Sequence, residues 1–315
     1  MLKSLSLTLF LFVFSVSPAT GFDNLYTNLQ EVSVTVNTGR SEGSGVIVTR
    51  KLKTGSGEME TVNFVWTAGH VIDSLRSVRT IISADGASRK IIEFKDAKII
   101  KELTENGRKV GELIMSAKVL KYSDAEDGED LALLLVRKRN FIQLGATFYE
   151  GDDPVPIGTE LYHVGSLLGQ GGHNSMTKGI MSQIGRVLDL GTGDGVVFDQ
   201  TTVTAFPGSS GGGVWLTERS GDKAGHYVGM LVRGAGETFN LIVPVRRMRS
   251  WATAQQVRWA IDKDVKVPSL DKILQLSIEG NKNPKKTDGQ SLTPDSKAFP
   301  TLPVSTAEVP PLQGR

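Results

Sequence analysis

Three short segments carry an imidazole, a carboxylate and a hydroxyl in settings that suit nucleophilic catalysis. The segments are Trp66–His70, Glu129–Leu133 and Pro207–Gly212. A serine hydroxyl is a weak nucleophile at neutral pH, and it becomes a strong one when an imidazole accepts its proton and a carboxylate orients that imidazole. We therefore predict a catalytic triad in which His70 is the base, Asp130 orients it and Ser210 attacks. A buried core histidine and a glycine-rich loop without chemistry are the alternatives for the first and third segments taken alone.

The order of the three residues separates two catalytic arrangements. Gly208–Gly212 also fits the Gly-x-Ser-x-Gly turn of α/β-hydrolases, in which the acid and the histidine follow the serine. Here only His226 follows Ser210, and the flanking segments alternate like strands. The order His, Asp, Ser is the one that two-barrel serine proteases use.

The glycines around Ser210 have a mechanical task. Acyl transfer places negative charge on a carbonyl oxygen, and backbone N–H groups in a tight turn can stabilise that charge when no side chain blocks the approach. We predict the N–H groups of Gly208 and Ser210 as the oxyanion-hole donors. Pro207 has no N–H and stiffens the entry to the turn.

The carboxylate comes from an acidic loop. Most members of a charge run face solvent, and a calcium loop is an alternative use of such residues. The run contains Asp124, Glu126, Asp127, Glu129 and Asp130. Asp130 differs from the rest because it directly precedes an apolar strand, which would carry its carboxylate inward.

The remaining ligand-type residues predict no metal and no cofactor. The chain has no cysteine, and His163, His173 and His226 show no metal-ligand spacing. His173 lies in a glycine-rich stretch, where we expect it to be solvated. Gly191–Gly195 lacks the lysine and helix of a phosphate-binding loop and is interpreted as a hairpin turn.

Composition indicates a globular protein without an affinity for nucleic acid. Of 315 residues, 39% are hydrophobic and 35 are glycine, and the formal net charge is only +2. From Asp23 onward the chain alternates like a β protein, which favours a barrel or a sandwich. The expected strands are 32–36, 43–49, 61–67, 77–82, 89–94, 109–119, 131–136, 160–164, 176–190, 195–199, 213–216, 227–233 and 239–243.

The two ends of the chain have different character. Residues 1–21 are typical of a signal peptide, with Lys3, an apolar run from Leu5 to Val16 and small residues at Ser17–Ala19. The run is short for a membrane span of roughly 17–25 residues. We expect a secreted or periplasmic protein with no stable membrane span after signal cleavage; an uncleaved N-terminal anchor is the minor alternative.

Toward the C-terminus the pattern becomes helical. Met248, Trp251 and Trp259 share one face of a predicted helix over 246–262, which we expect to dock on the strands rather than on a membrane surface. A short helix is predicted over 270–278 after a Ser269 cap. The segment from Gly280 onward is rich in Lys, Pro and Ser and is expected to be disordered.

Taken together, these motifs resemble the trypsin-like (chymotrypsin-fold) serine peptidases, and most closely the cysteine-free HtrA/Deg-type branch. The matching segments are Gly43–Val48, Thr67–Val71, Glu129–Leu133, Lys178–Arg186, Pro207–Gly212, Tyr227–Leu231 and Ile242–Pro244. The resemblance implies an all-β fold of two six-stranded antiparallel barrels with the triad between them and a C-terminal helix. It implies a protease domain over 22–262, with barrel one at about 25–140 and barrel two at about 150–245, and polypeptide substrates cleaved without a cofactor.

The chain departs from that branch at several points. Ser209 stands where an Asn is usual and Gly213 where a Pro is usual, and the 53 residues after 262 leave no room for a PDZ domain. A catalytically silent binding module on the same scaffold is therefore one alternative. A viral or phage protease that processes a polyprotein, or its own tail, is another.

The resemblance also implies a first specificity pocket. Its base is Thr204, six residues before the serine, and its walls are Val232, Arg233 and Gly234. Since Thr204 carries no charge, we expect small or medium uncharged side chains at the cleavage point, unless Arg233 turns inward and selects an acidic one. The sequence does not indicate an oligomeric state.

Overall fold

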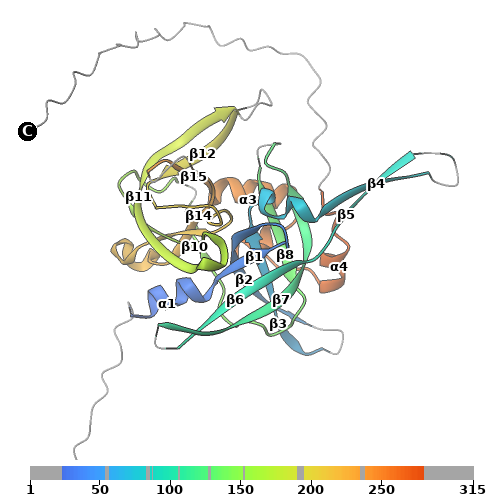
Figure 1. The fold of residues 1–315 in the computed structure, drawn as a ribbon, viewed down its shortest axis with the longest axis horizontal. Helices are drawn as coiled ribbons and strands as arrows, with labels where there is room; N and C mark the ends of the chain where they lie inside the picture. The colour runs from blue at the N-terminus through green and yellow to red at the C-terminus, as the bar shows by residue number, and fades with distance from the viewer. Residues whose placement is uncertain are drawn as a thin grey trace, which may run out of the picture. The chain divides into compact units, whose positions relative to one another are not determined.

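The strands between residues 23 and 279 form two connected systems with mainly antiparallel pairing (Figure 1). The computed structural model describes residues 23–279, except 54–56, 83–85, 87, 106, 127–128, 152, 190–194 and 235–237. The predicted signal peptide, the tail from Gly280 and most of the Gly191–Gly195 turn lie outside the described residues.

The first system is a closed barrel of six strands. They pair in the cyclic order β1-β2-β3-β8-β7-β6. The strands are β1 (Ser33–Asn37), β2 (Glu42–Lys53), β3 (Met59–Thr67), β6 (Ala97–Glu105), β7 (Arg108–Ser123) and β8 (Leu131–Val136). Every residue of β8 is buried, and β3 is buried from Thr61 to its end, so the two strands that lead to His70 and Asp130 run through the core. That burial fixes where both strands end.

The second system also closes on itself. Its strands pair in the order β13-β10-β11-β12-β15-β14, and β13 pairs with β14 to complete the ring. They are β10 (Glu160–Leu167), β11 (Gly172–Asp189), β12 (Gly195–Thr201), β13 (Gly213–Leu216), β14 (His226–Gly234) and β15 (Asn240–Pro244). The expected all-antiparallel pairing has one exception, because the short β9 (Thr147–Phe148) joins β14 in parallel.

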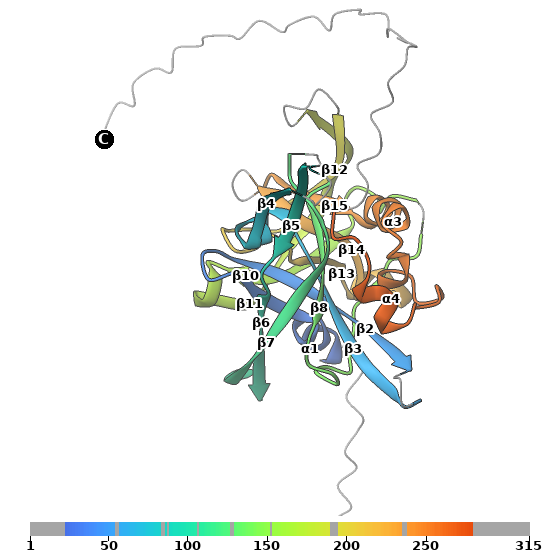
Figure 2. The same cartoon turned by 90° about the vertical axis from the view of Figure 1, so that its right-hand side faces the viewer.

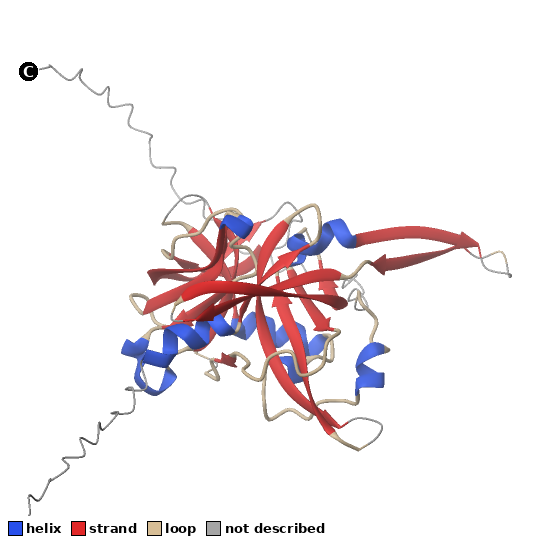
Figure 3. Cartoon of the chain, turned by 60° about the horizontal axis from the view of Figure 1, so that its bottom comes forward, coloured by secondary structure: helices blue, strands red, loops and turns tan. Residues whose placement is uncertain are grey.

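Helices cover the edges of the strands, as Figure 3 shows. They are α1 (Asp23–Glu31), α2 (Gly69–Ile72), α3 (Val245–Ala254) and α4 (Leu270–Leu274), with 3-10 turns η1 (Asp73–Leu75), η2 (Gly169–Gly171), η3 (Glu218–Lys223) and η4 (Arg258–Ala260). Figure 2 shows α3 and α4 on the same side of the strands. The hairpin of β4 (Arg76–Ile82) and β5 (Ser88–Phe94) extends away from both systems (Figure 1). None of the described helices has the length and apolar character needed to cross a membrane.

The helices correct three expectations. Residues 23–31 form α1 rather than part of a strand, and its buried Leu29 packs into the core. The predicted helix over 246–262 ends at Ala254, because Gln256 adopts a left-handed backbone (φ 61°) that an α-helix does not accept, and Trp259 reaches the core from η4 instead. The helix predicted over 270–278 ends at Leu274.

Candidate active site

His70 and Asp130 meet at one end of the first barrel. His70 lies in α2, directly after β3, and Asp130 directly precedes β8. The His70 Nδ1 atom is 2.9 Å from Asp130 Oδ2 and 3.0 Å from Oδ1, and the His70 main-chain N–H donates to Oδ1 at 2.9 Å. The Asp130 residue is 1% exposed, whereas the His70 side chain is 34% exposed. A ring held by Nδ1–H on a buried carboxylate leaves its basic Nε2 for a second partner.

The backbone around Asp130 is shaped for this contact. Asp130 has a φ of 50°, an uncommon conformation for a residue other than glycine, and its N–H donates to Asp124 O at 3.0 Å. Opposite it, a Cβ on Gly69 would lie 2.1 Å from Ser123 O and 3.3 Å from Asp130 Oδ1. Only glycine permits so close an approach, so the His70 turn and the Asp130 turn are fitted to each other.

A cation lies beside the Asp130 turn. The Arg247 side chain of α3 has its Nε 3.4 Å from Glu129 Oε2, and its guanidinium lies over the Phe198 ring at 4.9 Å. Burial lowers the pKa of Arg247, and the negative charges of Glu129 and Asp130 oppose that shift. The acidic loop is therefore only partly solvated, since Glu129 is half-buried against this cation.

The Ser210 loop is anchored through its main chain to the first barrel. Ser44 of β2 donates its N–H to Ser210 O at 2.7 Å and its hydroxyl to Gly208 O at 2.7 Å. Gly211, with φ 87°, lies so close to β2 and β3 that a Cβ there would be 2.1 Å from Ser44 O and 2.4 Å from Thr67 Oγ1. These contacts place the loop against the strand end that leads into His70.

The turn itself is well formed. Ser209 N–H donates to Phe206 O at 2.9 Å, Gly212 N–H donates to Ser209 O at 3.0 Å, and Phe206 N–H donates to Ser209 Oγ at 3.1 Å. Within the described part of the chain, the N–H groups of Gly208 and Ser210 donate no hydrogen bond. Two unengaged N–H groups in one turn are the donors that an oxyanion requires.

Ser209 and Gly213, which differ from the residues usual in the HtrA/Deg-type branch, each have a local role. Ser209 is fully buried, and its hydroxyl closes the turn onto Phe206. Gly213 packs against the face of Trp215, where a Cβ would lie 2.5 Å from the ring. Neither residue prevents the turn from forming.

Among the described contacts, no hydrogen bond joins His70 to Ser210. They are linked through Gly43 of β2, where a Cβ would lie 2.5 Å from Val71 Cγ2 and 3.0 Å from Ser210 O. The residue after His70 and the main chain of Ser210 therefore touch the same point of β2.

The four residues expected to form the specificity pocket lie in different environments. Thr204 is half-buried, and its carbonyl accepts a hydrogen bond from Thr177 Oγ1 at 2.9 Å. Val232 is 3% exposed and its side chain belongs to the core. Arg233 reaches Ala125 O at 3.4 Å, beside the acidic loop, and Gly234 is exposed.

The other histidines serve the fold. His163 is fully buried behind the Ser210 loop, where its Nδ1–H donates to Gly213 O at 2.9 Å, and burial lowers its pKa to about 4. His173 and His226 are half-buried, and burial lowers the pKa of each; the expectation that His173 is solvated was wrong. Among the residues that the structure describes, no three His, Asp or Glu side chains gather as a metal site would require.

Sequence reasoning missed the residues that hold the loop. The Ser44 hydroxyl accepts the Ser166 N–H at 2.7 Å while it donates to Gly208 O, and the Thr67 hydroxyl donates to Ser44 O at 2.7 Å. The sequence feature that could have indicated this role is the Gly43–Gly45 segment, in which Ser44 stands between two glycines near the start of a strand. Its partners are far away in the sequence, so the spacing alone could not identify them.

The fold and the site define a class, that of the chymotrypsin-like serine endopeptidases. Similar solved structures include the serine endoprotease from Yersinia pestis (18% identity, 77% of this chain and 68% of that one, TM-score 0.50). Deg5 is similar at 18% identity over 76% of this chain and 95% of that one, with a TM-score of 0.50. An HtrA-type protease with a tripeptide matches at 20% identity over 76% and 64%, also with a TM-score of 0.50.

The family follows from the sequence match. The family model of the trypsin-like peptidase domain matches residues 43–225, which is more than half of the chain. The chain therefore belongs to the trypsin-like peptidase family. No curated protein sequence matches it.

Proposed function

We propose that this protein is an exported serine endopeptidase that uses His70, Asp130 and Ser210. One observation carries the proposal. A buried carboxylate holds His70 Nδ1 at 2.9 Å, and the Ser210 loop is fastened to the strand beside that histidine. The pair is what a serine nucleophile needs from its neighbours, and the family shows that the chain has the matching scaffold.

The catalytic groups act in sequence in the proposed reaction. The Ser210 hydroxyl attacks the substrate carbonyl carbon while its proton passes to His70 Nε2, and Asp130 stabilises the imidazolium that results. The N–H groups of Gly208 and Ser210 hold the oxyanion. His70 then gives the proton to the leaving amine, which departs as the Ser210 acyl ester forms. Water, deprotonated by His70, hydrolyses the ester and restores the serine.

A fluorophosphonate probe tests this assignment. We expect the full chain to be labelled on Ser210, and labelling to be lost in Ser210→Ala with the fold retained by circular dichroism. Turnover of a peptide substrate should fall by roughly 10⁶ in the same variant. Ser77→Ala is the control, since it removes an exposed hydroxyl from the β4–β5 hairpin, away from the Ser210 loop. Full activity in Ser210→Ala would overturn the proposal.

Digestion of a peptide library tests the proposed substrates. We propose polypeptides cleaved after small or medium uncharged side chains, because the half-buried Thr204 offers no charge. Since Arg233 reaches the acidic loop at Ala125, it is less available to select an acidic residue. Enrichment of Asp or Glu at the cleavage point would contradict this preference.

Export is tested by the N-terminus of the mature protein. We propose that residues 1–21 direct secretion or transfer to the periplasm and are then removed. Mass spectrometry of the protein from an export-competent host should show a new N-terminus near Ala19. An intact Met1 on membrane-bound protein would support the anchor instead.

The same probe separates the two alternatives. A silent binding module would show no labelling of the folded wild type. A self-processing protease would differ in its C-terminus from Ser210→Ala, and identical termini would exclude it.

A further inference from the structure

An open recess of about 610 Å³ lies away from the proposed triad. We call it the Arg50 recess. It is lined by the end of β2 (49–51), by β9 and by the segment 261–265 that follows α3 and η4. None of His70, Asp130 and Ser210 lines it. Its volume falls within the range of small-molecule sites.

Arg50 places a charge in the wall of this recess without a carboxylate partner. Its guanidinium donates to three main-chain carbonyls, those of Trp259 (2.7 Å), Thr49 (2.8 Å) and Ile261 (3.3 Å). Among the described residues, no carboxylate lies within ion-pair distance of Arg50. Burial lowers the pKa of Arg50 and the charge of Asp262, beyond ion-pair distance, opposes that shift; arginine stays charged at neutral pH. Three of its five N–H groups are used, so two remain for a ligand.

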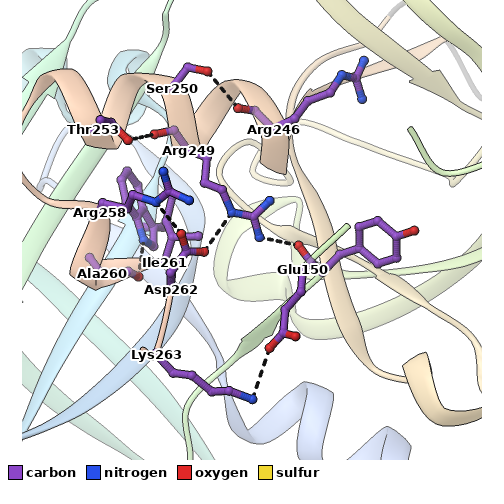
Figure 4. Close-up of polar contacts among 12 residues, drawn as sticks. Glu150, Arg246, Arg249, Ser250, Thr253, Arg258, Ala260, Ile261, Asp262 and Lys263 are labelled. Carbon is purple, nitrogen blue, oxygen red and sulfur yellow. Dashed lines mark hydrogen bonds and ion pairs between the residues drawn. The ribbon is translucent and has the colours of Figure 1, made fainter. Parts of the chain in front are cut away.

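Two of the three carboxylates of the lining, Asp262 and Glu150, are engaged by other cations (Figure 4), and the third is Asp264. Asp262 accepts Arg249 Nε at 2.8 Å and Arg258 Nε at 2.6 Å. Glu150 pairs with Lys263 at 3.1 Å. Counting all side chains of the lining, five cations face three carboxylates, a formal net charge of +2.

The recess also has an apolar part. The half-buried Ala146 and Val265 give it apolar surface, and the almost fully buried Phe148 and Ile261, 4% and 3% exposed, complete that part of the lining. An inorganic anion would need only the positive charge of the recess for binding. A surface that joins an unpaired guanidinium to apolar side chains instead suits a ligand with a charged end and an apolar body.

We propose that the Arg50 recess binds a small organic anion, a carboxylate or phosphate group joined to an apolar body. The anionic group lies against Arg50, in a recess that Lys51 and Lys263 also line, and the apolar body lies against Ala146 and Val265. The site is separate from the proposed triad, so it does not depend on peptidase activity.

Titration calorimetry of the full chain tests this with four probes: 4-phenylbutyrate, phenyl phosphate, inorganic phosphate and the neutral 4-phenylbutanol. We expect saturable one-to-one binding of at least one of the two aromatic anions with Kd below about 1 mM. The neutral alcohol and inorganic phosphate should each bind at least about tenfold more weakly. Which aromatic anion binds more tightly identifies the anionic group.

Variants locate the binding. Arg50→Gln should weaken binding of the preferred anion at least about tenfold, and Arg50→Lys should restore part of it. Because Arg50 also bonds three carbonyls, the variant Lys51→Gln with Lys263→Gln serves as a second arm that leaves those bonds in place. It should weaken binding by about threefold or more. Ser210→Ala and the exposed Lys138→Gln should bind like the wild type.

Three results would overturn the proposal. The first is that neither aromatic anion shows saturable binding to the folded protein. The second is that the alcohol or inorganic phosphate binds as tightly as they do. The third is that both recess variants, folded by circular dichroism, keep the wild-type affinity.

Discussion

The two halves of the proposed active site are built by different means. The His70–Asp130 pair belongs to the first barrel and is fixed by side chains, a buried carboxylate on an imidazole at 2.9 Å. The Ser210 loop enters the second strand system and is fixed by its main chain, through Ser44 and through glycines that admit no Cβ. The first arrangement depends on the identity of two residues, and the second on backbone shape. We therefore expect a substitution in the first half to lower activity, and a substitution that shifts the backbone of the second half to lower both stability and activity.

After Ser210→Ala, the largest expected effect tests the side-chain half. Asp130→Asn keeps the shape of the side chain but cannot stabilise the imidazolium, so kcat should fall by about 10⁴. Fluorogenic peptide hydrolysis measures it, with the exposed Asp222→Asn as the control. A fall of less than tenfold in a folded variant would show that another group orients His70.

Gly211→Ala tests the main-chain half. The new Cβ would lie 2.1 Å from Ser44 O at a φ of 87°. Left-handed strain and overpacking together should cost about 2–5 kcal/mol of unfolding free energy, and activity should fall with the shifted loop. Urea unfolding and probe labelling report the two losses.

Gly39→Ala is the matched control for that prediction. Gly39 also has a positive φ, 82°, but nothing lies within 4 Å of a Cβ there. It should cost only about 1–2 kcal/mol and leave labelling intact. Equal losses at both glycines would mean that contact with Ser44 does not matter.

This difference explains what could be predicted from the sequence. His70 and Asp130 were identifiable because each adjoins a buried apolar strand, and such strands end where their patterns end. The contact between them is now observed. Ser210 was identifiable from its glycines. The bonds from Ser44 to Gly208 and Ser210 were not, because they join residues 164 or more positions apart that only the packed barrels bring together.

Other misses have local causes. The helix ends at Ala254 because Gln256 adopts a left-handed φ, and glutamine is not a residue type that signals this conformation in a sequence. By contrast, α1 could have been found, since Leu25 and Leu29 are four residues apart on one helical face and both pack on the core.

Acidification should destabilise the Ser210 half through His163 of β10. Burial holds its pKa at about 4, below the usual 6.5, and Gly212 and Gly213 of the Ser210 segment pack against it. The unfolded chain therefore binds more protons than the folded one between these pH values. The unfolding free energy should rise with pH from about 4 to 6.5, by up to about 3 kcal/mol.

Urea unfolding at several pH values measures this slope. The variant His163→Asn keeps a donor for Gly213 O but does not titrate. Its unfolding free energy should therefore rise less steeply with pH, by the contribution of His163. An identical slope in both proteins would assign the acid sensitivity to other groups.

The smallest effect concerns a single hydroxyl that joins the two halves. Ser44→Ala removes the bond to Gly208 O and leaves the Ser166 N–H without its acceptor, both at 2.7 Å. Losing these buried bonds should cost about 1–3 kcal/mol. Because Gly208 is a proposed oxyanion donor, kcat/KM should fall by about 5- to 100-fold as well.

Ser33→Ala distinguishes a positional effect from a loss of stability. Ser33 is also buried, and its hydroxyl donates to Leu29 O at 2.7 Å, where α1 meets β1. It should lower the unfolding free energy by a similar amount and leave kcat/KM within about twofold. If both variants lose activity in proportion to stability, the Ser44 hydroxyl only supports the barrel. If Ser44→Ala alone loses activity, one strand of the first barrel sets the geometry of a loop that the second barrel carries.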